Sequence, residues 1–290
     1  MKPAFRASLT FGLIAPALLN AAERGVATDN AKAAALLTAA CEAKQQKACF
    51  DVAKMHWSGD VTGWIDWNPA WKAFKDGVAV DEAAALALHQ KDCDSGAAAA
   101  CYNLGIMHGN GWGVPKDQAK AAQAYQKSCE GGDAAGCYGF GQALRMGSGV
   151  PKDETKALEA YKKSCDNRYA PGCYKHAFLY EEGLGVAKDV AKAAPIYQES
   201  CERGDAGACS KIGSLYEAGQ GVAKSEAKAA QFYERGCEGR ALRGCYKLAA
   251  LYENGLGVAK DQAKATALYQ KACDGGFADA CSGARPQPAK

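Results

Sequence analysis

The amino-acid sequence predicts an all-α fold, a solenoid in which pairs of antiparallel helices follow one another along the chain. The first observation is a repeat of 36 residues, marked by Cys93, Cys129, Cys165, Cys201, Cys237 and Cys273. An internal period of this length is typical of solenoids, whose units bury their apolar faces against their neighbours. The second observation is that each unit carries two apolar stretches at helical spacing, separated by glycines and a capping residue.

The chain begins with a segment that has the layout of a secretory signal peptide. Lys2 and Arg6 precede an apolar run, and small residues follow that run. The run is too short to cross a bilayer as a permanent helix. We therefore expect residues 1–22 to be a signal peptide, with cleavage after either Ala17 or Ala22, and the protein to be secreted or periplasmic.

All the cysteines fall into one regular pattern. The 14 cysteines form seven C-x7-C pairs, which are Cys41 with Cys49, Cys93 with Cys101, Cys129 with Cys137, Cys165 with Cys173, Cys201 with Cys209, Cys237 with Cys245, and Cys273 with Cys281. Such regularity behind an export signal predicts a disulfide framework formed in an oxidising compartment. Zinc is the competing explanation, but structural zinc sites favour shorter knuckles or nearby histidines. We expect seven disulfides, no metal and no cofactor.

One unit shows how the two helices are delimited. From Cys245, apolar residues recur at helical spacing up to Tyr252, and Gly255 then ends the first helix. Asp261 is a suitable N-cap for the second helix, and its counterparts are Asp81, Asp117, Asp153, Asp189 and Ser225. Each cysteine pair then joins the end of one unit's second helix to the start of the next unit's first, within the Cα separation that a disulfide permits.

The repeat array is expected to occupy residues 23–283 as a single domain. It should contain six helix pairs, with a capping helix that carries Cys41 before them and a truncated helix that carries Cys281 after them. The tail, residues 284–290, is expected to be disordered.

An insert interrupts the period in the first repeat. The spacing from Cys49 to Cys93 is 44 residues, where the other units have 28. The 16 extra residues lie within an aromatic-rich insert at about 58–78, and this region contains Trp57, Trp64, Trp67, Trp71 and Phe74. Either the insert folds back and seals the first repeat, or it offers an aromatic platform to a peptide, a glycan or a partner protein.

The repeated pattern A-x-x-x-L-(A)-x-L-Y-E-x-G-x-G-V-x-K-D-x-x-K-A-x-x-x-Y-x-K-A-C resembles the Sel-1-like repeat, a relative of the tetratricopeptide repeat. Its C-x7-C version is similar to the cysteine-rich Sel-1-like proteins first described in Helicobacter. The resemblance covers about residues 29–283. It implies a right-handed α/α superhelix, disulfides between adjacent repeats, and secretion or periplasmic residence. A compartment like the mitochondrial intermembrane space is the alternative.

For function, the same resemblance implies an adaptor that binds other proteins, with penicillin binding or weak β-lactamase activity as the alternative. The spacing Ser225-x-x-Lys228 matches one motif of serine β-lactamases, but Ser225 stands at an N-cap position, and no K-T-G, S-D-N or H-E-x-x-H occurs. The histidines, His56, His89, His108 and His176, replace other residues at packing positions. We therefore expect a non-enzymatic protein.

The expected partner is a protein or an extended peptide. A net charge of +3 with a mixed periodic surface does not indicate a nucleic-acid-binding protein. The sequence places a recurrent tyrosine on the first helix of most units, at Tyr102, Tyr138, Tyr174 and Tyr246, and we expect these residues to line the concave binding face. A cell-wall-related ligand is the alternative partner.

Overall fold

The computed structural model describes residues 82–283, which contain eleven α-helices, one 3-10 helix and no strand. The helices are α5 (Glu82–Asp94), α6 (Ala98–Asn110), α7 (Gln118–Glu130), α8 (Ala134–Met146), α9 (Glu154–Asp166), α10 (Ala170–Glu182), α11 (Val190–Glu202), α12 (Ala206–Ala218), α13 (Glu226–Glu238), α14 (Leu242–Asn254), α15 (Gln262–Asp274) and η1 (Ala278–Cys281). The predicted all-α fold is confirmed. The predicted signal peptide, the predicted capping helix with Cys41, the tryptophan-rich insert and the tail fall outside the described residues.

Five complete helix pairs follow α5 in the part of the chain that is described, from α6–α7 to α14–α15. The second helix of each pair begins at a capping side chain that accepts a hydrogen bond from the backbone N–H three residues on. These caps are Asp117, Asp153, Asp189, Ser225 and Asp261, at 2.9–3.3 Å. The predicted N-caps are therefore confirmed, except for Asp81, which falls outside the described residues.

The Gly-x-Gly loops connect the two helices of a pair and also bring neighbouring pairs together. Gly219 ends α12 with a φ of 69°, in the left-handed region where a side chain is disfavoured. Gly221 has a φ of 70°, and a Cβ built on it would lie 2.6 Å from the backbone carbonyl carbon of Val190 in the preceding repeat. The first glycine thus allows the turn, and the second allows the loop to touch the previous pair.

A disulfide joins every described junction between units. Six bridges link α5 to α6, α7 to α8, α9 to α10, α11 to α12, α13 to α14 and α15 to η1, with Cα atoms 4.2–4.9 Å apart. In chain order they join Cys93 with Cys101, Cys129 with Cys137, Cys165 with Cys173, Cys201 with Cys209, Cys237 with Cys245, and Cys273 with Cys281. Six of the seven predicted pairings are therefore present, and the seventh, Cys41 with Cys49, falls outside the described residues.

Small side chains fill the space between helices. Ala157, Ala193 and Ala229 are fully buried at one repeat offset, next to the fully buried tyrosines Tyr161, Tyr197 and Tyr233 at another. Alternating large and small residues in this way lets helices pack at close range without voids. Because the same offsets recur in successive units, each helix pair contributes an equivalent set of buried residues to the core.

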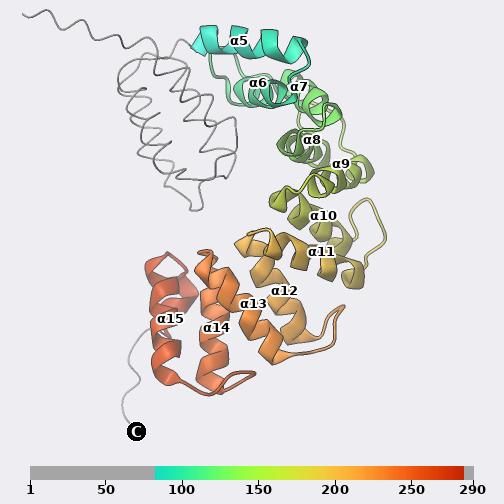
Figure 1. The fold of residues 1–290 in the computed structure, drawn as a ribbon. Helices are drawn as coiled ribbons and strands as arrows, with labels where there is room; N and C mark the ends of the chain where they lie inside the picture. Colours follow the sequence, from blue (N-terminus) through green and yellow to red (C-terminus); the bar gives the residue numbers. More distant parts are fainter. Residues whose placement is uncertain (1–81, 284–290) are drawn as a thin grey trace, which may run out of the picture. The chain divides into compact units, whose positions relative to one another are not determined.

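The helices form two layers (Figure 1). Even-numbered helices contact the even-numbered helix of the next pair, as in α6–α8, α8–α10 and α12–α14. Among the odd-numbered helices of the described residues, only α7 and α9 make a comparable contact. The even-numbered helices are therefore closer together and lie on the inner side of the curved stack, which we call the inner face.

Candidate functional site

A row of tyrosines follows the inner face. Tyr102, Tyr138, Tyr174 and Tyr246 lie on α6, α8, α10 and α14 and are half-buried. Each ring packs against a tyrosine of the second helix in its own pair, with ring centroids 5.4–5.8 Å apart. One side of each ring therefore anchors the helix pair, while part of the ring stays available at the surface.

The cysteine before each ring fixes the start of its helix. Cys101, Cys137, Cys173 and Cys245 directly precede the four tyrosines, and Cys209 precedes Ser210 at the same offset. Cys101, Cys137 and Cys209 are 0–3% exposed, and each is bonded to the cysteine eight residues before it. These predicted site residues are therefore structural. Their bridges lie beneath the inner face and hold its aromatic row in place.

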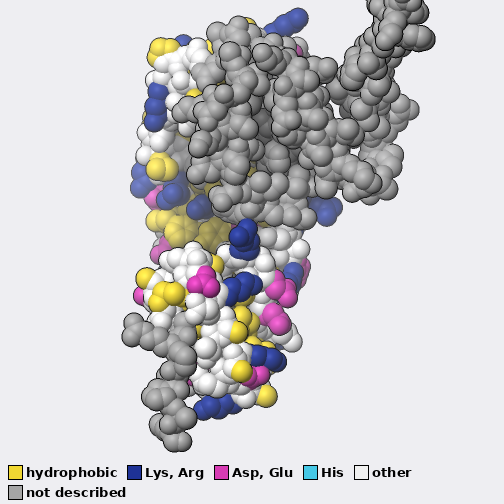
Figure 2. Space-filling view, turned by 90° about the vertical axis from the view of Figure 1, so that its left-hand side faces the viewer, with side chains coloured by type: hydrophobic (Ala, Val, Ile, Leu, Met, Phe, Trp, Pro, Cys, Tyr) yellow, Lys and Arg dark blue, Asp and Glu magenta, His cyan; other side chains and the backbone are white. Residues whose placement is uncertain are grey.

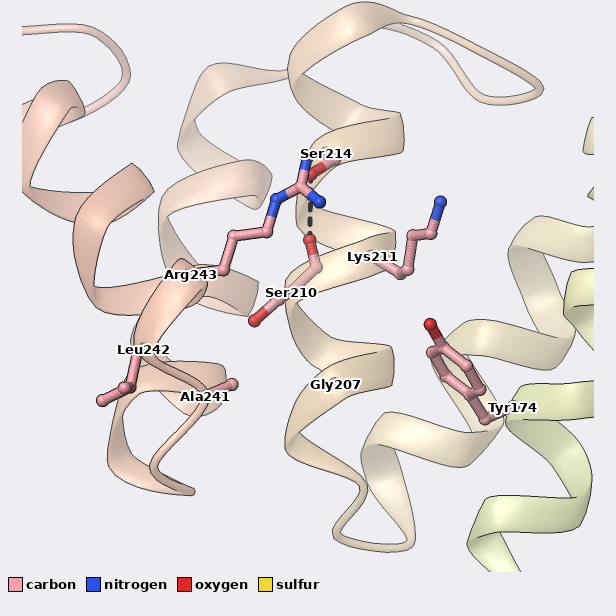
Figure 3. Close-up of a pocket in the computed structure, with 8 residues that line it drawn as sticks. All are labelled: Tyr174, Gly207, Ser210, Lys211, Ser214, Ala241, Leu242 and Arg243. Carbon is pink, nitrogen blue, oxygen red and sulfur yellow. Dashed lines mark hydrogen bonds between the residues drawn. The ribbon is translucent and has the colours of Figure 1, made fainter. Parts of the chain in front are cut away.

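One position in this row has no aromatic ring. Ser210 on α12 stands 36 residues after Tyr174 and 36 before Tyr246, and it fills much less space than a tyrosine. A pocket of about 210 Å³ lies at this place (Figure 3). Its lining residues are Tyr174, Gly207, Ser210, Lys211, Ser214, Ala241, Leu242 and Arg243. The missing ring explains why a hollow opens here.

The pocket combines an apolar floor with polar and cationic edges. In Figure 3, Tyr174 and Lys211 lie on one side of Ser210, and Leu242 and Arg243 lie on the other. Ser214 Oγ donates a hydrogen bond to the Ser210 carbonyl oxygen at 3.0 Å. Arg243 is exposed, and none of the described carboxylates lies within ion-pair distance of it. The pocket can accommodate a side chain and offers donors to a polar group beside it.

A polar ladder connects successive pairs next to this row. Glu181 on α10 accepts hydrogen bonds from the hydroxyl of Tyr197 at 2.6 Å and from Nζ of Lys211 at 2.9 Å. Glu217 likewise accepts from Tyr233 at 2.5 Å and from Lys247 at 3.2 Å. Burial, and then the hydrogen bond to the neighbouring glutamate, raise the pKa of each of these two tyrosines. Each glutamate thus joins three helices.

Basic side chains are spread over the same side of the molecule. Figure 2 looks onto the left-hand side of Figure 1 and shows Lys and Arg side chains between apolar patches and scattered acidic ones. Lys211 and Lys247 are half-buried and paired with acids of the ladder. The visible part of this side is therefore mixed in character, with cations beside both apolar and acidic side chains.

The described histidines occupy packing positions, as the sequence predicts. His89, His108 and His176 are 6–8% exposed. The ring of His176 packs edge-on against Tyr180 at 5.3 Å, and burial lowers its pKa to about 4. Burial also lowers the pKa of His108. The three rings come from different repeats and do not converge on one site. His56 falls outside the described residues.

Ser225 caps the start of α13. Its Oγ accepts the backbone N–H of Lys228 at 3.3 Å. The Lys228 ammonium lies 5.1 Å from the centre of the Tyr216 ring, as Lys192 and Lys264 lie over Tyr180 and Tyr252 in other repeats. The S-x-x-K spacing therefore follows from the repeat and forms no catalytic pair.

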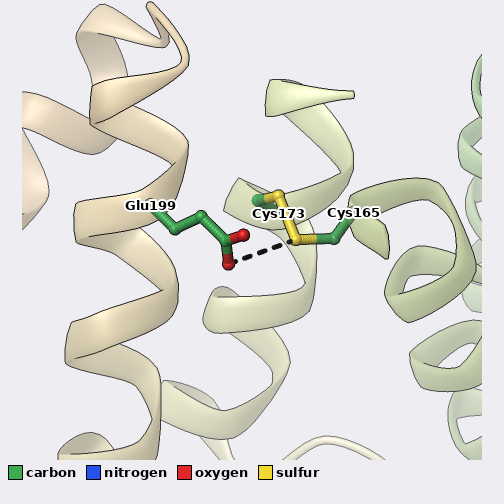
Figure 4. A group of neighbouring side chains, drawn as sticks. All are labelled: Cys165, Cys173 and Glu199. Atoms are coloured by element: carbon green, nitrogen blue, oxygen red, sulfur yellow. Dashed lines mark hydrogen bonds between the residues drawn. A yellow bond between two sulfur atoms is a disulfide. The ribbon is translucent and has the colours of Figure 1, made fainter. Parts of the chain in front are cut away.

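One cluster resembles a ligand set but has different chemistry (Figure 4). Cys165, Cys173 and Glu199 lie close together, but both sulfurs belong to one disulfide. A disulfide provides no thiolate to bind a metal. Arg203 pairs with Glu199 at 2.6 Å and donates to the Cys165 carbonyl oxygen at 2.5 Å, so the carboxylate already has a cation. The cluster supports the junction between α9, α10 and α11.

The structure thus brings together part of the predicted binding surface. The four tyrosines lie on one face, whereas Trp57, Trp64, Trp67, Trp71 and Phe74 fall outside the described residues. Sequence reasoning missed the pocket at Ser210. The signal was present, because aligning the five complete helix pairs at 36 residues leaves Ser210 in a column that is otherwise tyrosine. Whether the missing ring leaves a pocket depends on the side chains of the neighbouring helices, which the sequence does not place.

These observations define the protein as an α-solenoid of helix-pair repeats with a disulfide at each described junction. The chain belongs to the Sel1 repeat family. The model of that family, the Sel1 repeat, matches residues 17–44, 46–70, 98–133, 134–169, 170–205, 206–239 and 242–277. The first match begins inside the segment for which the sequence predicts a signal peptide. A search of curated proteins gave no significant match.

Solved structures of two related proteins share this architecture. A Sel1 repeat protein from Oxalobacter formigenes is 30% identical, with a TM-score of 0.60, and 64% of this chain and 76% of that chain are covered. A protective antigen of uropathogenic Escherichia coli with an SLR fold, c5321, is 26% identical, with a TM-score of 0.67 over 85% of this chain. This chain spans 57% of the length of c5321. The Helicobacter pylori cysteine rich protein B is 33% identical, with 45% of this chain and 93% of that chain covered, at a TM-score of 0.38.

Two further properties follow from the described residues. None of their helices is both long and apolar enough to cross a membrane. Disulfides persist in oxidising compartments and are rare in the reducing cytosol. Six of them in the described residues therefore indicate an oxidising environment.

Proposed function

We propose that this protein is an exported, disulfide-linked repeat scaffold that binds an extended peptide or a partner protein on its inner face. The observation that carries the proposal is the pocket at Ser210, set in a row of half-buried tyrosines. Tyrosines whose rings are already held by packing lose little side-chain entropy when a partner covers them. A pocket among such rings is the arrangement in which binding hot spots form.

The disulfides support this function through rigidity. A bridge at each described junction holds successive pairs in register, so the inner face is preorganised before a partner arrives. A rigid scaffold with a fixed row of rings suits an extended segment that runs along several repeats. We include the aromatic insert, with Trp57, Trp64, Trp67, Trp71 and Phe74, as a second candidate contact surface.

Export is the part of the proposal that rests on the N-terminal segment and the cysteines. If residues 1–22 direct secretion, mature protein recovered from its host should begin after Ala17 or Ala22. Mass spectrometry of the unreduced protein would show the new N-terminus and the loss of two hydrogens for each disulfide. An intact N-terminus with free thiols would place the protein in a reducing compartment.

The binding proposal is tested by filling the pocket. Ser210→Tyr restores the aromatic column, and the new ring should occupy the pocket between Tyr174 and Arg243. Peptides selected from a random library on the wild-type protein should bind this variant at least about tenfold more weakly, because a hot-spot pocket is lost. Met146→Tyr is the control, since it adds a ring at a side chain that is 67% exposed on α8. Equal binding by all three proteins would contradict the proposal.

β-Lactamase activity, the alternative implied by the family resemblance, gains no support from the described residues. Ser225 is engaged as a helix cap, and its neighbour Lys228 lies over an aromatic ring. Hydrolysis of a chromogenic β-lactam by the purified protein is the direct test.

A further inference from the structure

At one repeat, the position that carries a glutamate in the polar ladder carries a positively charged residue. In the glutamate column, Glu181, Glu217 and Glu253 recur at intervals of 36 residues, and Arg145 occupies the same offset on α8. For Glu181 and Glu217 the paired lysine lies 30 residues further on, at Lys211 and Lys247. For Arg145 that residue is Lys175 on α10. The repeat therefore places a guanidinium where the carboxylate of the ladder should be.

Arg145 and Lys175 consequently form a cluster of two cations, which we call the cation cluster. Among the described residues, no carboxylate lies within ion-pair distance of either side chain. The Lys175 ammonium lies 5.5 Å from the centre of the Tyr174 ring and 6.0 Å from that of Phe178. Burial and the nearby Arg145 lower the pKa of Lys175, and Asp205 opposes them without forming an ion pair.

The hydroxyl behind the cation cluster also lacks its usual acceptor. Tyr161 is fully buried, and its hydroxyl donates to no carboxylate but lies against the guanidinium of Arg145. In the two following repeats the equivalent hydroxyls, of Tyr197 and Tyr233, donate to the glutamate. Buried polar atoms in native structures are almost always paired. Two cations and a buried hydroxyl, at a place where the next two repeats have a carboxylate, therefore favour an anion from outside the chain.

The surroundings also favour a ligand that extends beyond this point. Tyr174, whose ring lies under the Lys175 ammonium, also lines the pocket at Ser210. The cation cluster and the pocket are therefore adjacent along α10 on the inner face. A peptide that places a charged group at the cation cluster can place a neighbouring side chain in the pocket.

We propose that Arg145 and Lys175 bind the side-chain carboxylate of an acidic peptide segment, which takes the place that Glu181 and Glu217 occupy in the next two repeats. This inference rests on the proposed function of the inner face and names the chemistry of its partner. The polar ladder indicates which chemical group would bind here, because the neighbouring repeats place a carboxylate between a tyrosine hydroxyl and a lysine. In this environment charge-assisted hydrogen bonds are stronger than neutral ones.

The test uses fluorescein-labelled hexaglutamate, acetylated and amidated, with hexaglutamine as the matched neutral peptide. Fluorescence anisotropy should show binding of hexaglutamate only, and the binding should weaken several-fold between 0.05 M and about 0.5 M NaCl because ions screen the pair. Arg145→Glu should weaken it at least about tenfold, because the new carboxylate pairs with Lys175 and closes the ladder. It should also raise Tm.

Two further variants test the charge of Lys175 and control for a general effect of charge. Lys175→Met retains the packing on Tyr174 and Phe178 but removes the charge, and it should also lose at least about tenfold in affinity. Lys116→Glu makes the same charge change as Arg145→Glu at an exposed loop residue and should bind within about twofold of wild type. Equal binding by wild type and Arg145→Glu, or no binding up to about 1 mM peptide, overturns the proposal.

A third peptide separates the two possible sources of a carboxylate. Acetylated hexaglutamine with a free C-terminus carries only a terminal carboxylate, and it should bind no better than its amidated form. Binding by this peptide alone would overturn the side-chain assignment. If library peptides still respond to Ser210→Tyr while hexaglutamate fails to bind, the acidic partner is wrong and the peptide-binding function stands.

Discussion

The ammonium of Lys211 on α12 lies 2.9 Å from Oε1 of Glu181 on α10, and this ion pair connects two consecutive repeats. The same carboxylate accepts the hydroxyl of Tyr197 on α11. Three helices therefore meet at one half-buried side chain. The same arrangement recurs at Glu217, whereas Arg145 puts a positive charge at the equivalent position. Comparing mutations at these positions within one protein therefore measures how much the ladder contributes to the free energy of unfolding.

The first prediction concerns the tyrosine hydroxyls of the ladder. Tyr197→Phe removes the donor to a half-buried carboxylate and should lower the free energy of unfolding by about 1–3 kcal/mol. Tyr161→Phe is the matched control, since its hydroxyl donates to no carboxylate, and it should stay within about 0.5 kcal/mol of wild type or stabilise the protein. Guanidinium denaturation followed by circular dichroism, with the disulfides intact, measures both. Equal losses would show that the hydroxyl of Tyr197 contributes nothing through Glu181.

The second prediction concerns pH and His176. Burial, with a smaller contribution from Lys162 and an opposing one from Asp166, lowers the pKa of His176 from 6.5 to about 4. Between these values the unfolded chain binds a proton that the folded chain does not. The contribution of His176 to stability should therefore fall by up to about 3 kcal/mol as pH decreases from about 6.5 to about 4, and this contribution should change no further below that range.

The matched variant for this pH dependence is His176→Leu, which copies Leu104 and Leu248 at the same offset. Its free energy of unfolding should depend less on pH across that range than that of wild type. Denaturant titrations at pH 4 and pH 7 on both proteins give the difference. An unchanged slope in the variant would assign the pH dependence to other groups.

The third prediction concerns the junction disulfides. The double variant Cys165→Ala with Cys173→Ala removes a bridge with a sequence separation of 8, and the entropy of so small a loop corresponds to about 2–3 kcal/mol. Because this bridge lies between α9 and α10, hydrogen exchange should increase on both sides of it. The pair Cys273→Ala with Cys281→Ala should release η1 alone. Similar exchange in the two variants would show that the bridges do not hold individual junctions.

The fourth prediction separates a cap from a catalytic serine. Ser225→Ala should lower stability by about 0.5–2 kcal/mol through loss of the N-cap of α13, and Asp189→Ala should cost a similar amount at α11. Neither variant nor wild type should hydrolyse a chromogenic β-lactam. Hydrolysis by wild type that is lost only in Ser225→Ala would assign a catalytic role to Ser225.

Local patterns predicted the elements correctly. Asp117, Asp153, Asp189, Ser225 and Asp261 cap the helices that the sequence assigned to them, because an N-cap depends on residues within one turn. The cysteine pairs were equally predictable, since a separation of 8 residues across a turn constrains the two ends. The site was harder to predict, since its residues come from different repeats.

The sequence by itself determined the all-α repeat, the helix boundaries and the positions of the junction disulfides, because all of these follow from spacings within 36 residues. Only the tertiary structure decided that Ser210 opens a pocket beside Tyr174, and that Arg145 lies near both Lys175 and Tyr161. The physical reason is that stacking brings together side chains 16 and 30 residues apart on three helices, as in Tyr197, Glu181 and Lys211. The period shows that such residues recur, but which side chains meet depends on how the pairs pack.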